Sequence, residues 1–308
     1  MNIEKILRRC RVDKPRPFRL ARHDPAETFG LSTDADKIKN MLADGIAKLE
    51  KLQPRLYADG RWSVLIVFQG MDAAGKDSAI KHVMSGVNPQ GCEVHGFKEP
   101  SAEELEHDFL WRAAQRLPAR GRIGIFNRSY YEEVLVVRVH PEMLQRQKLP
   151  PGTTGPDLWK HRFKEIRAFE RHLVRSGTLV LKFHLRISKE EQRKRFLARI
   201  DEPAKRWKFS MNDIKERGRW DRYMAAYEEM IRATSTEYAP WYVVPSDQKH
   251  VAWLVVAEAI VEALQSVRLD YPKITGNALK ELKAVEKTLR AEAPAKTRKR
   301  SKPDSSSA

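Results

Sequence analysis

The sequence predicts an α/β fold, a parallel sheet of about five strands with helices on both faces. Short apolar runs alternate with longer stretches whose apolar residues recur at helical spacing, which is the order that right-handed βαβ crossovers require. A glycine-rich loop with a lysine joins the first apolar run to the following helix. With 308 residues and 41% hydrophobic content, the chain can bury one main core.

Residues 1–32 are basic and contain prolines without a sustained apolar period. We therefore predict an arm that lies over the domain or is partly mobile. The pattern changes at Asp34, where apolar residues begin to recur at helical spacing as far as Leu56. Ser32 and Thr33 precede this stretch as candidate N-caps. We expect one amphipathic helix here.

The predicted strands are short and rich in β-branched residues, as buried parallel strands are. Longer stretches of helical periodicity separate them. The strands are expected at 63–69, 92–98, 122–128, 178–187 and 241–246. The helices between and after them are expected at 75–87, 101–116, 157–176, 188–201, 211–233 and 248–268.

The amino-acid composition narrows the classes of function that this chain can have. The chain has 58 Lys and Arg against 41 Asp and Glu, a formal net charge of +17, which favours a polyanionic partner. Its two cysteines, Cys10 and Cys92, lie far apart and form no CxxC, which argues against a disulfide framework and a thiolate zinc site. No apolar leader is present, and no apolar run approaches the roughly 20 residues that span a bilayer. We expect a cytoplasmic protein without membrane insertion.

The segment 70–77, GMDAAGKD, matches the GxxxxGK phosphate-binding pattern between a predicted strand and a predicted helix. Glycines allow the backbone to wrap around a phosphate, while the loop N–H groups and the helix N-terminus supply positive potential. A tight turn with an incidental lysine is the alternative. The predicted phosphate-binding residues are Gly70, Ala73, Ala74, Gly75, Lys76 and Asp77.

Two carboxylates accompany this loop. Asp77 follows Lys76 where an ordinary Walker A loop has Ser or Thr, and Asp72 lies inside the loop. Carboxylate oxygens are ligands that Mg²⁺ prefers. For Asp72 we expect metal binding, directly or through water. For Asp77, metal binding and helix capping stand as equal alternatives.

A basic cluster lies in the fourth predicted interval between strands. Arg195 and Arg199 are four residues apart in a predicted helix, so both guanidiniums can reach one anion. The alternative is a solvated face on which these charges pair with neighbouring carboxylates. We expect an anion-binding role for Arg199 and leave Arg193 open between the two. The other members of the cluster are Arg206 and Lys208.

Five segments in order resemble the polyphosphate kinase 2 family. They are GMDAAGKD (70–77), FNRSYYEEVLVVRVH (126–140), RWKFS (206–210), WDRYMAAYEEM (220–230) and APWYVVPSDQK (239–249). The resemblance covers roughly residues 30–270 and is strongest to the subgroup with Asn in the second segment. Resemblance to this subgroup implies that the protein phosphorylates both AMP and ADP.

The resemblance implies a thymidylate-kinase-like P-loop kinase fold over residues 33–270, with a helical lid around 190–220. Residues 271–308 then form a helical extension and a basic tail, which we predict to be disordered from about residue 290. A basic groove for the phosphate chain is also implied, as are Mg²⁺, with Mn²⁺ as a substitute, and a homodimer or homotetramer.

The resemblance also assigns residues. Asp72 and Lys76 carry over from the first segment and Arg128 from the second, and with Arg199 they form the expected catalytic set. Asn127 stands where much of the family has the Walker B aspartate, which leaves the metal ligand at this position open. The further metal candidates are Asp77, Glu132 and Glu133.

The expected reaction is Mg²⁺-assisted, reversible in-line transfer of a phosphoryl group from inorganic polyphosphate to AMP or ADP, with guanine nucleotides as further acceptors. An NTP-dependent nucleoside monophosphate kinase on the same fold is the first alternative. A polyanion-binding or nucleic-acid-binding protein that uses the +17 charge is a more distant one.

Overall fold

The computed structural model describes residues 3–13, 17–31 and 35–292. The chain divides into two compact units, residues 1–270 and 271–308. The predicted disordered tail lies outside the described residues, except that the segment up to residue 292 completes the last helix and its C-cap. None of the described helices combines the length and apolar character that a membrane crossing needs.

A six-stranded sheet forms the centre of the first unit, with strand order β1-β6-β5-β2-β4-β3. Five of its strands are parallel, as predicted, and β1 pairs with β6 in the antiparallel sense. The strands are β1 (Arg11–Val12), β2 (Ser63–Gln69), β3 (Cys92–Gly96), β4 (Ile123–Asn127), β5 (Thr178–Arg186) and β6 (Trp241–Pro245).

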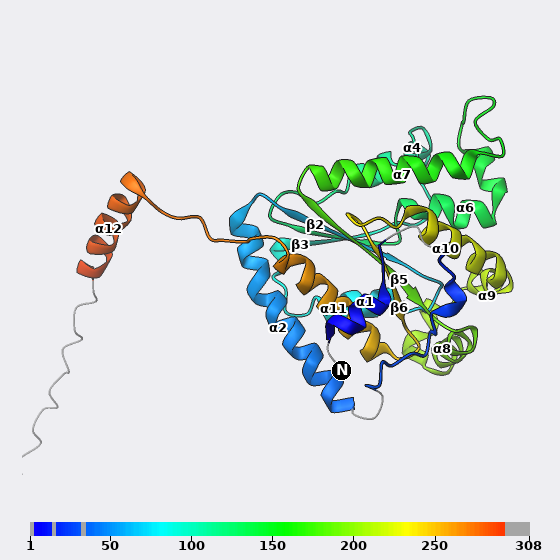
Figure 1. The fold of residues 1–308 in the computed structure, drawn as a ribbon, viewed down its shortest axis with the longest axis horizontal. Helices are drawn as coiled ribbons and strands as arrows, with labels where there is room; N and C mark the ends of the chain where they lie inside the picture. The colour runs from blue at the N-terminus through cyan, green and yellow to red at the C-terminus, as the bar shows by residue number, and fades with distance from the viewer. Residues whose placement is uncertain (1–2, 14–16, 32–34, 293–308) are drawn as a thin grey trace, which may run out of the picture. The chain divides into compact units, whose positions relative to one another are not determined.

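Helices cover both faces of the sheet (Figure 1). One layer contains α1 (Ile3–Cys10), α2 (Ala35–Asp59), α3 (Lys76–Val83) and α11 (Lys249–Gln265). The other contains α7 (Leu158–Arg175) and α10 (Trp220–Thr234). The segment predicted as a lid, around residues 190–220, contains α8 (Lys189–Asp201), the 3₁₀ helix η5 (Pro203–Lys208) and α9 (Met211–Gly218).

Short helices connect these elements. They are α4 (Ala102–Leu105), α5 (Trp111–Ala114), α6 (Val136–Val139) and the 3₁₀ helices η1 (Leu20–Arg22), η2 (Pro89–Gly91), η3 (Tyr130–Val134) and η4 (Pro141–Arg146). The helix predicted at 101–116 is thus two short helices. The Asp108 carboxylate accepts a bond of 2.9 Å from the N–H of Leu110, a local turn that competes with helix continuation.

The N-terminal segment holds regular structure that the sequence did not predict. Helix α1 buries Ile6, Leu7 and Cys10 against the core, and β1 extends the sheet beside β6. A helix of eight residues shows too little periodicity to be recognised among its many charges. The segment predicted as an arm is therefore partly built into the domain.

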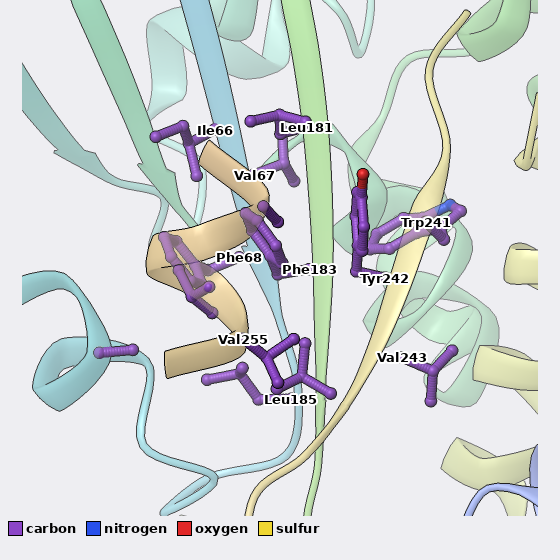
Figure 2. Packing of buried hydrophobic residues seen from close by; sticks show 14 of the residues in the cluster. Ile66, Val67, Phe68, Leu181, Phe183, Leu185, Trp241, Tyr242, Val243 and Val255 are labelled. Atoms are coloured by element: carbon purple, nitrogen blue, oxygen red, sulfur yellow. The ribbon is translucent and has the colours of Figure 1, made fainter. Parts of the chain in front are cut away.

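The core lies between the sheet and its helices, where the middle strands are buried on both faces. All seven residues of β2 are buried, which is why this strand is a continuous apolar run in the sequence. Figure 2 shows Phe68, Phe183 and Tyr242 side by side across three neighbouring strands, with Val255 of α11 packed nearby. This packing holds the carboxyl ends of β2, β5 and β6 in a fixed register.

The second unit contains one described helix, α12 (Gly276–Ala291), which begins after Thr275 and ends at the C-cap Glu292.

Candidate active site

The carboxyl ends of the parallel strands meet at one edge of the sheet, and the expected site residues gather there. The loop 70–75 follows β2, Arg128 follows β4, α8 begins shortly after β5, and α11 begins shortly after β6. Ligands of open α/β sheets bind in the crevice at this edge, where neighbouring connections leave toward opposite faces.

Two glycines allow the loop after β2 to take its path. Gly70 has φ of +155°, and a Cβ placed on it would lie 2.7 Å from the carbonyl oxygen of Leu185. Gly75 has φ of +104° and forms the N-cap of α3. A side chain would strain the backbone at both positions. The two glycines of the GxxxxGK pattern therefore determine the backbone conformation of the loop.

Lys76 is the first residue of α3, and its side chain folds back over the loop. Its ammonium donates to the carbonyl oxygens of Gly70 at 2.7 Å and Met71 at 3.2 Å. Burial lowers the pKa of Lys76, and Arg128 lowers it further, while Asp72 opposes the shift. A phosphate in the adjoining pocket would favour the charged form of this lysine.

Asp72, Arg128 and Glu132 form one charged group beside the loop. The Arg128 guanidinium donates to Asp72 Oδ1 at 2.7 Å and lies 3.5 Å from Glu132 Oε2. The charge of Glu132 raises the pKa of Arg128, with Asp72 adding to the effect. Burial raises the pKa of Glu132 although Arg128 and Lys76 oppose it. Two predicted catalytic residues are thus in direct contact.

The backbone of Arg128 is strained. Its φ is +63°, a left-handed conformation that costs a non-glycine residue on the order of 1 kcal/mol or more. The Arg128 N–H donates to Phe68 O at 3.0 Å, which fixes the turn against β2. The strain is compatible with an arginine held in one defined direction.

A buried polar network anchors the segment after Arg128. Glu170 of α7 accepts hydrogen bonds from the hydroxyls of Tyr130 at 2.8 Å and Tyr131 at 2.7 Å. Lys182 of β5 donates to the same carboxylate at 2.6 Å, and both charged side chains are fully buried. Removing either partner would leave an uncompensated buried charge. The network therefore fixes η3, which carries Glu132.

Asn127 and Asp77 face one another. The Asn127 side-chain amide donates to Asp77 Oδ1 at 2.6 Å, joining the end of β4 to the first turn of α3. Asp77 is therefore held by an amide and not only by the helix N-terminus. Glu133, the last of the predicted metal candidates, points elsewhere: Arg162 and Gln147 donate to its carboxylate at 3.0 and 2.6 Å.

Arg195 clamps the loop from outside. It donates to the carbonyl oxygens of Ala73 and Ala74, at 2.9 and 3.2 Å, and to those of Ser246 and Asp247, at 2.5 and 3.0 Å. The side chain is only 10% exposed, and both of its terminal nitrogens donate to backbone carbonyl oxygens. This geometry gives Arg195 a positioning role for the loop. Arg195 also lines the pocket beside the loop, so the phosphate contact expected from the sequence stays a prediction.

The remaining basic lid residues divide into two groups. Arg193 pairs with Glu190 at 2.7 Å on the exposed surface, and Arg206 donates to the carbonyl of Ile200 at 2.8 Å. Neither lines the pocket beside the loop. Arg199 and Lys208 do line it, and Arg199 lies 3.3 Å from Asp213.

The largest of the pockets described around the loop has a volume of about 670 Å³ and a strongly basic lining. It brings together side chains from α3, α8, η5, α11 and the segment after β3. Four lysines in it were not predicted as site residues: three stand outside the recognised segments, and Lys249 is the last residue of one of them. The four lysines are Lys81, Lys98, Lys205 and Lys249.

A second pocket of about 450 Å³ adjoins the first and is mixed in character. Phe97 and Phe109 supply aromatic surface, while Arg112 and Arg146 supply positive charge. A smaller pocket of about 310 Å³ lies under α9 and α10. Arg128 lines all three pockets, so it stands at their junction.

No cluster of three or more His, Cys, Asp or Glu side chains suited to a metal ion occurs within residues 3–13, 17–31 and 35–292. The carboxylates beside the loop are Asp72, Asp77 and Glu132. Asp72 and Asp77 each have one oxygen in a hydrogen bond to a neighbouring side chain. Magnesium at phosphoryl-transfer sites needs only one or two protein carboxylates, because phosphates and water complete its coordination.

A phosphate-binding loop at the carboxyl edge of a parallel sheet, with a buried lysine and a converging arginine, defines a P-loop phosphotransferase. Comparison with known proteins gives the family: residues 32–272 match the family described as Polyphosphate kinase 2. The chain belongs to the polyphosphate kinase 2 family. The resemblance stated from the sequence, and with it the P-loop kinase fold, is confirmed.

Individual relatives are similar over most of their length. An ADP-polyphosphate phosphotransferase of Rhodopseudomonas palustris is 55% identical over 243 residues, 79% of this chain and 84% of that protein. An AMP/ADP-polyphosphate phosphotransferase of Meiothermus ruber is 45% identical over 267 residues, 87% of this chain and 96% of that protein. The crystal structure of polyphosphate kinase 2 from Arthrobacter aurescens TC1 has a TM-score of 0.82 at 39% identity and covers 93% of this chain and 97% of that one.

Proposed function

We propose that this protein transfers phosphoryl groups from inorganic polyphosphate to AMP and ADP. The observation that carries the assignment is the position of Arg128, which lines both the basic pocket and the aromatic pocket. One pocket suits a chain of phosphates and the other a nucleoside, so a transferred group would lie beside Arg128. The names of the relatives from Rhodopseudomonas palustris and Meiothermus ruber support the same substrates.

The basic pocket suits polyphosphate because it concentrates like charges that a polyanion would neutralise. Lys249 illustrates this: burial lowers its pKa, and the charges of Arg195 and Lys205 lower it further. The neighbouring cations create a positive potential at Lys249, and an anion bound in the pocket would offset it. A nucleotide alone would neutralise fewer of these cations than a longer phosphate chain.

The aromatic pocket suits a nucleoside. The Arg112 guanidinium lies 5.1 Å from the ring centroid of Phe97, and Arg162 lies 5.1 Å from that of Phe109. Aromatic faces stack any purine, so we propose adenine nucleotides as the main acceptors and guanine nucleotides as further ones. Arg112 and Arg146 line this pocket, and we propose that they contact acceptor phosphates.

The chemistry needs no strong base, because the terminal phosphate of the acceptor is already ionised near neutral pH. An oxygen of that phosphate attacks the terminal phosphorus of polyphosphate. The P–O bond to the penultimate phosphate breaks, and the shortened chain leaves with the electron pair as an oxyanion. Lys76, Arg128 and the loop N–H groups neutralise charge on the transferred group. One phosphoanhydride replaces another, so the reaction is reversible.

We propose Mg²⁺ as the cofactor, with Mn²⁺ as a substitute. Asp72 and Asp77 would hold it, since each carboxylate has a second oxygen beyond the hydrogen bond described above. When bound, the ion would neutralise charge on the phosphates. We also propose a cytoplasmic location, which the two free cysteines suit, and a homo-oligomer, as the family resemblance implies.

The assignment is tested with purified protein, AMP, polyphosphate and Mg²⁺ in the absence of any NTP, followed by separation of the nucleotides. We expect ADP and then ATP to form. Lys76→Met should fold normally and lose at least about a hundredfold in turnover, because a contact to the transferred charge is removed.

Product formation only when an NTP is added would favour a nucleoside monophosphate kinase instead. Salt-sensitive nucleic-acid binding that survives Lys76→Met, without any turnover, would favour a binding protein.

A further inference from the structure

A small pocket lies between the N-terminal segment and the carboxyl ends of β5 and β6. It has a volume of about 180 Å³ and shares no lining residue with the three pockets around the phosphate-binding loop. Most of its lining precedes residue 32, where the family match begins. The charged residues that line it are three arginines, Arg9, Arg22 and Arg186, and two carboxylates, Asp24 and Glu27. The transfer reaction proposed above uses none of them.

Arg186, the last residue of β5, lacks an acceptor for its guanidinium. Its Nε is buried without a hydrogen-bond partner, and no ion pair of its side chain occurs within residues 3–13, 17–31 and 35–292. Burial lowers the pKa of Arg186, while the charges of Asp24 and Asp247 oppose the shift. A buried guanidinium donor without an acceptor is unfavourable, and an oxyanion in the pocket would supply the acceptor.

The other two arginines differ in how their charges are balanced. Arg9 of α1 forms an ion pair with Glu27. Arg22, at the end of η1, is exposed, and its side chain forms no ion pair in the part of the chain that the structure describes. Of the lining carboxylates, this leaves Asp24 to balance Arg22 and Arg186. The pocket therefore has an excess of positive charge, which favours an anion.

Asp24 and the size of the pocket narrow the choice of anion. A carboxylate repels a fully ionised oxyanion, but it accepts a hydrogen bond from an oxyanion that keeps a proton. Near neutral pH orthophosphate keeps a proton and sulfate keeps none. Pockets for larger organic ligands have volumes of about 300–1,000 Å³, so a pocket of about 180 Å³ suits a single phosphate group better than a nucleotide.

We propose that this pocket binds one phosphate group that keeps a proton, at a site separate from the phosphate-binding loop. Arg22 and Arg186 donate hydrogen bonds to the phosphate oxygens, and Asp24 accepts the hydrogen bond from the P–O–H group. Free orthophosphate and the terminal group of a polyphosphate chain both present this chemistry. The site does not depend on the acceptor nucleotides proposed above.

Equilibrium dialysis of the full-length protein with labelled orthophosphate tests the site. Arg22→Met and Arg186→Met should each raise the dissociation constant at least about tenfold, because each removes a charge-assisted hydrogen bond. Arg8→Met is the matched control, because it removes the same charge at an exposed position of the N-terminal segment outside the pocket. It should leave the constant unchanged. Lys76→Met should also leave it unchanged, which separates this site from the phosphate-binding loop.

The same measurement with labelled tripolyphosphate distinguishes the two sources of the phosphate group. Weaker binding of orthophosphate in Arg22→Met identifies free phosphate as the ligand. Weaker binding of tripolyphosphate alone identifies the end of a chain.

Competition by sulfate tests the role of Asp24. In the parent protein, sulfate should compete for the site at least about tenfold more weakly than unlabelled phosphate, because it has no proton to donate to the carboxylate. Asp24→Asn should remove most of this preference, because the neutral amide can donate a hydrogen bond to either anion.

Three results would overturn the proposal. One is that Arg22→Met and Arg186→Met bind both labelled compounds as tightly as the parent protein does. Another is that Arg8→Met weakens binding as much as Arg22→Met, since net charge alone would then account for the attraction. The third is equal competition by sulfate and phosphate in the parent protein.

Discussion

At the scale of single residues, the contact between Asn127 and Asp77 explains why an amide can replace the usual acid of this motif. The two side chains approach to 2.6 Å, and Asp72 and Glu132 lie close to the same loop. A carboxylate at position 127 would place a second negative charge against Asp77. The resulting repulsion would be unfavourable unless a bound metal ion or a proton offset it. The amide avoids this repulsion and still ties β4 to α3.

This contact gives a prediction. Asn127→Asp should remain active and require less Mg²⁺ for half-maximal rate, because a further carboxylate beside Asp77 strengthens cation binding. It should use ADP less well relative to AMP, because the added charge penalises the more anionic acceptor. Rates with both acceptors across a magnesium titration measure these effects.

Asp77→Asn is the matched second change, since it restores the original charge in an Asn127→Asp background. The double variant should return to the magnesium dependence of the parent. Two results would contradict this account: Asn127→Asp with the magnesium dependence of the parent, or a double variant in which Asp77→Asn does not restore that dependence. Either result would mean that the charges at positions 77 and 127 do not together determine magnesium binding.

At the scale of elements, α8 shows where sequence reasoning succeeds and where it stops. The helix was predicted at 188–201 and is found at Lys189–Asp201, because Ser188 caps it and its charges suit a solvated helix. The prediction that Arg195 and Arg199 share an anion depended on their spacing alone. Spacing does not reveal that four backbone carbonyls from two other loops approach Arg195.

The phosphate-binding loop was predictable because all its determinants are local: two glycines, one lysine and the change from strand to helix. The aromatic pocket was not, because Phe97, Phe109 and Arg112 come from connections after β3 that carry no recognised motif. The buried pair of Lys182 and Glu170 was also missed. Its partners belong to a strand and a helix that meet only in the folded sheet.

The clamp on the loop gives a prediction for α8. Arg195→Met should lower stability by about 2 kcal/mol, because buried carbonyls lose their donor, and should lower turnover about tenfold as the loop loses its fixed geometry. Thermal unfolding and steady-state rates measure the two effects.

Arg193→Met is the matched control, because Arg193 lies on the same helix and pairs only with Glu190 among the contacts described at its side chain. It should leave the midpoint of thermal unfolding unchanged, because exposed ion pairs contribute little to stability. Equal effects of the two substitutions would contradict the clamp.

At the scale of the whole molecule, the formal charge of +17 is partly concentrated at one edge of the sheet. Elements far apart in the sequence bring Lys81, Lys98, Lys205 and Lys249 into the same pocket as Lys76. Composition predicted a polyanionic partner but could not place it, because the convergence depends on the order of the strands. The parallel topology creates the pocket, and the aromatic pocket adjoins it.

The central claim is that one cleft is divided into a polyphosphate half and a nucleoside half that meet at Arg128. Michaelis constants for both substrates in two matched variants test it most directly. Lys249→Met should raise KM for polyphosphate about tenfold, more at low salt, and leave KM for AMP unchanged. Phe109→Ala should raise KM for AMP about tenfold and leave KM for polyphosphate unchanged. If each substitution raises both constants equally, or if the pattern is reversed, the division of the cleft proposed here is wrong.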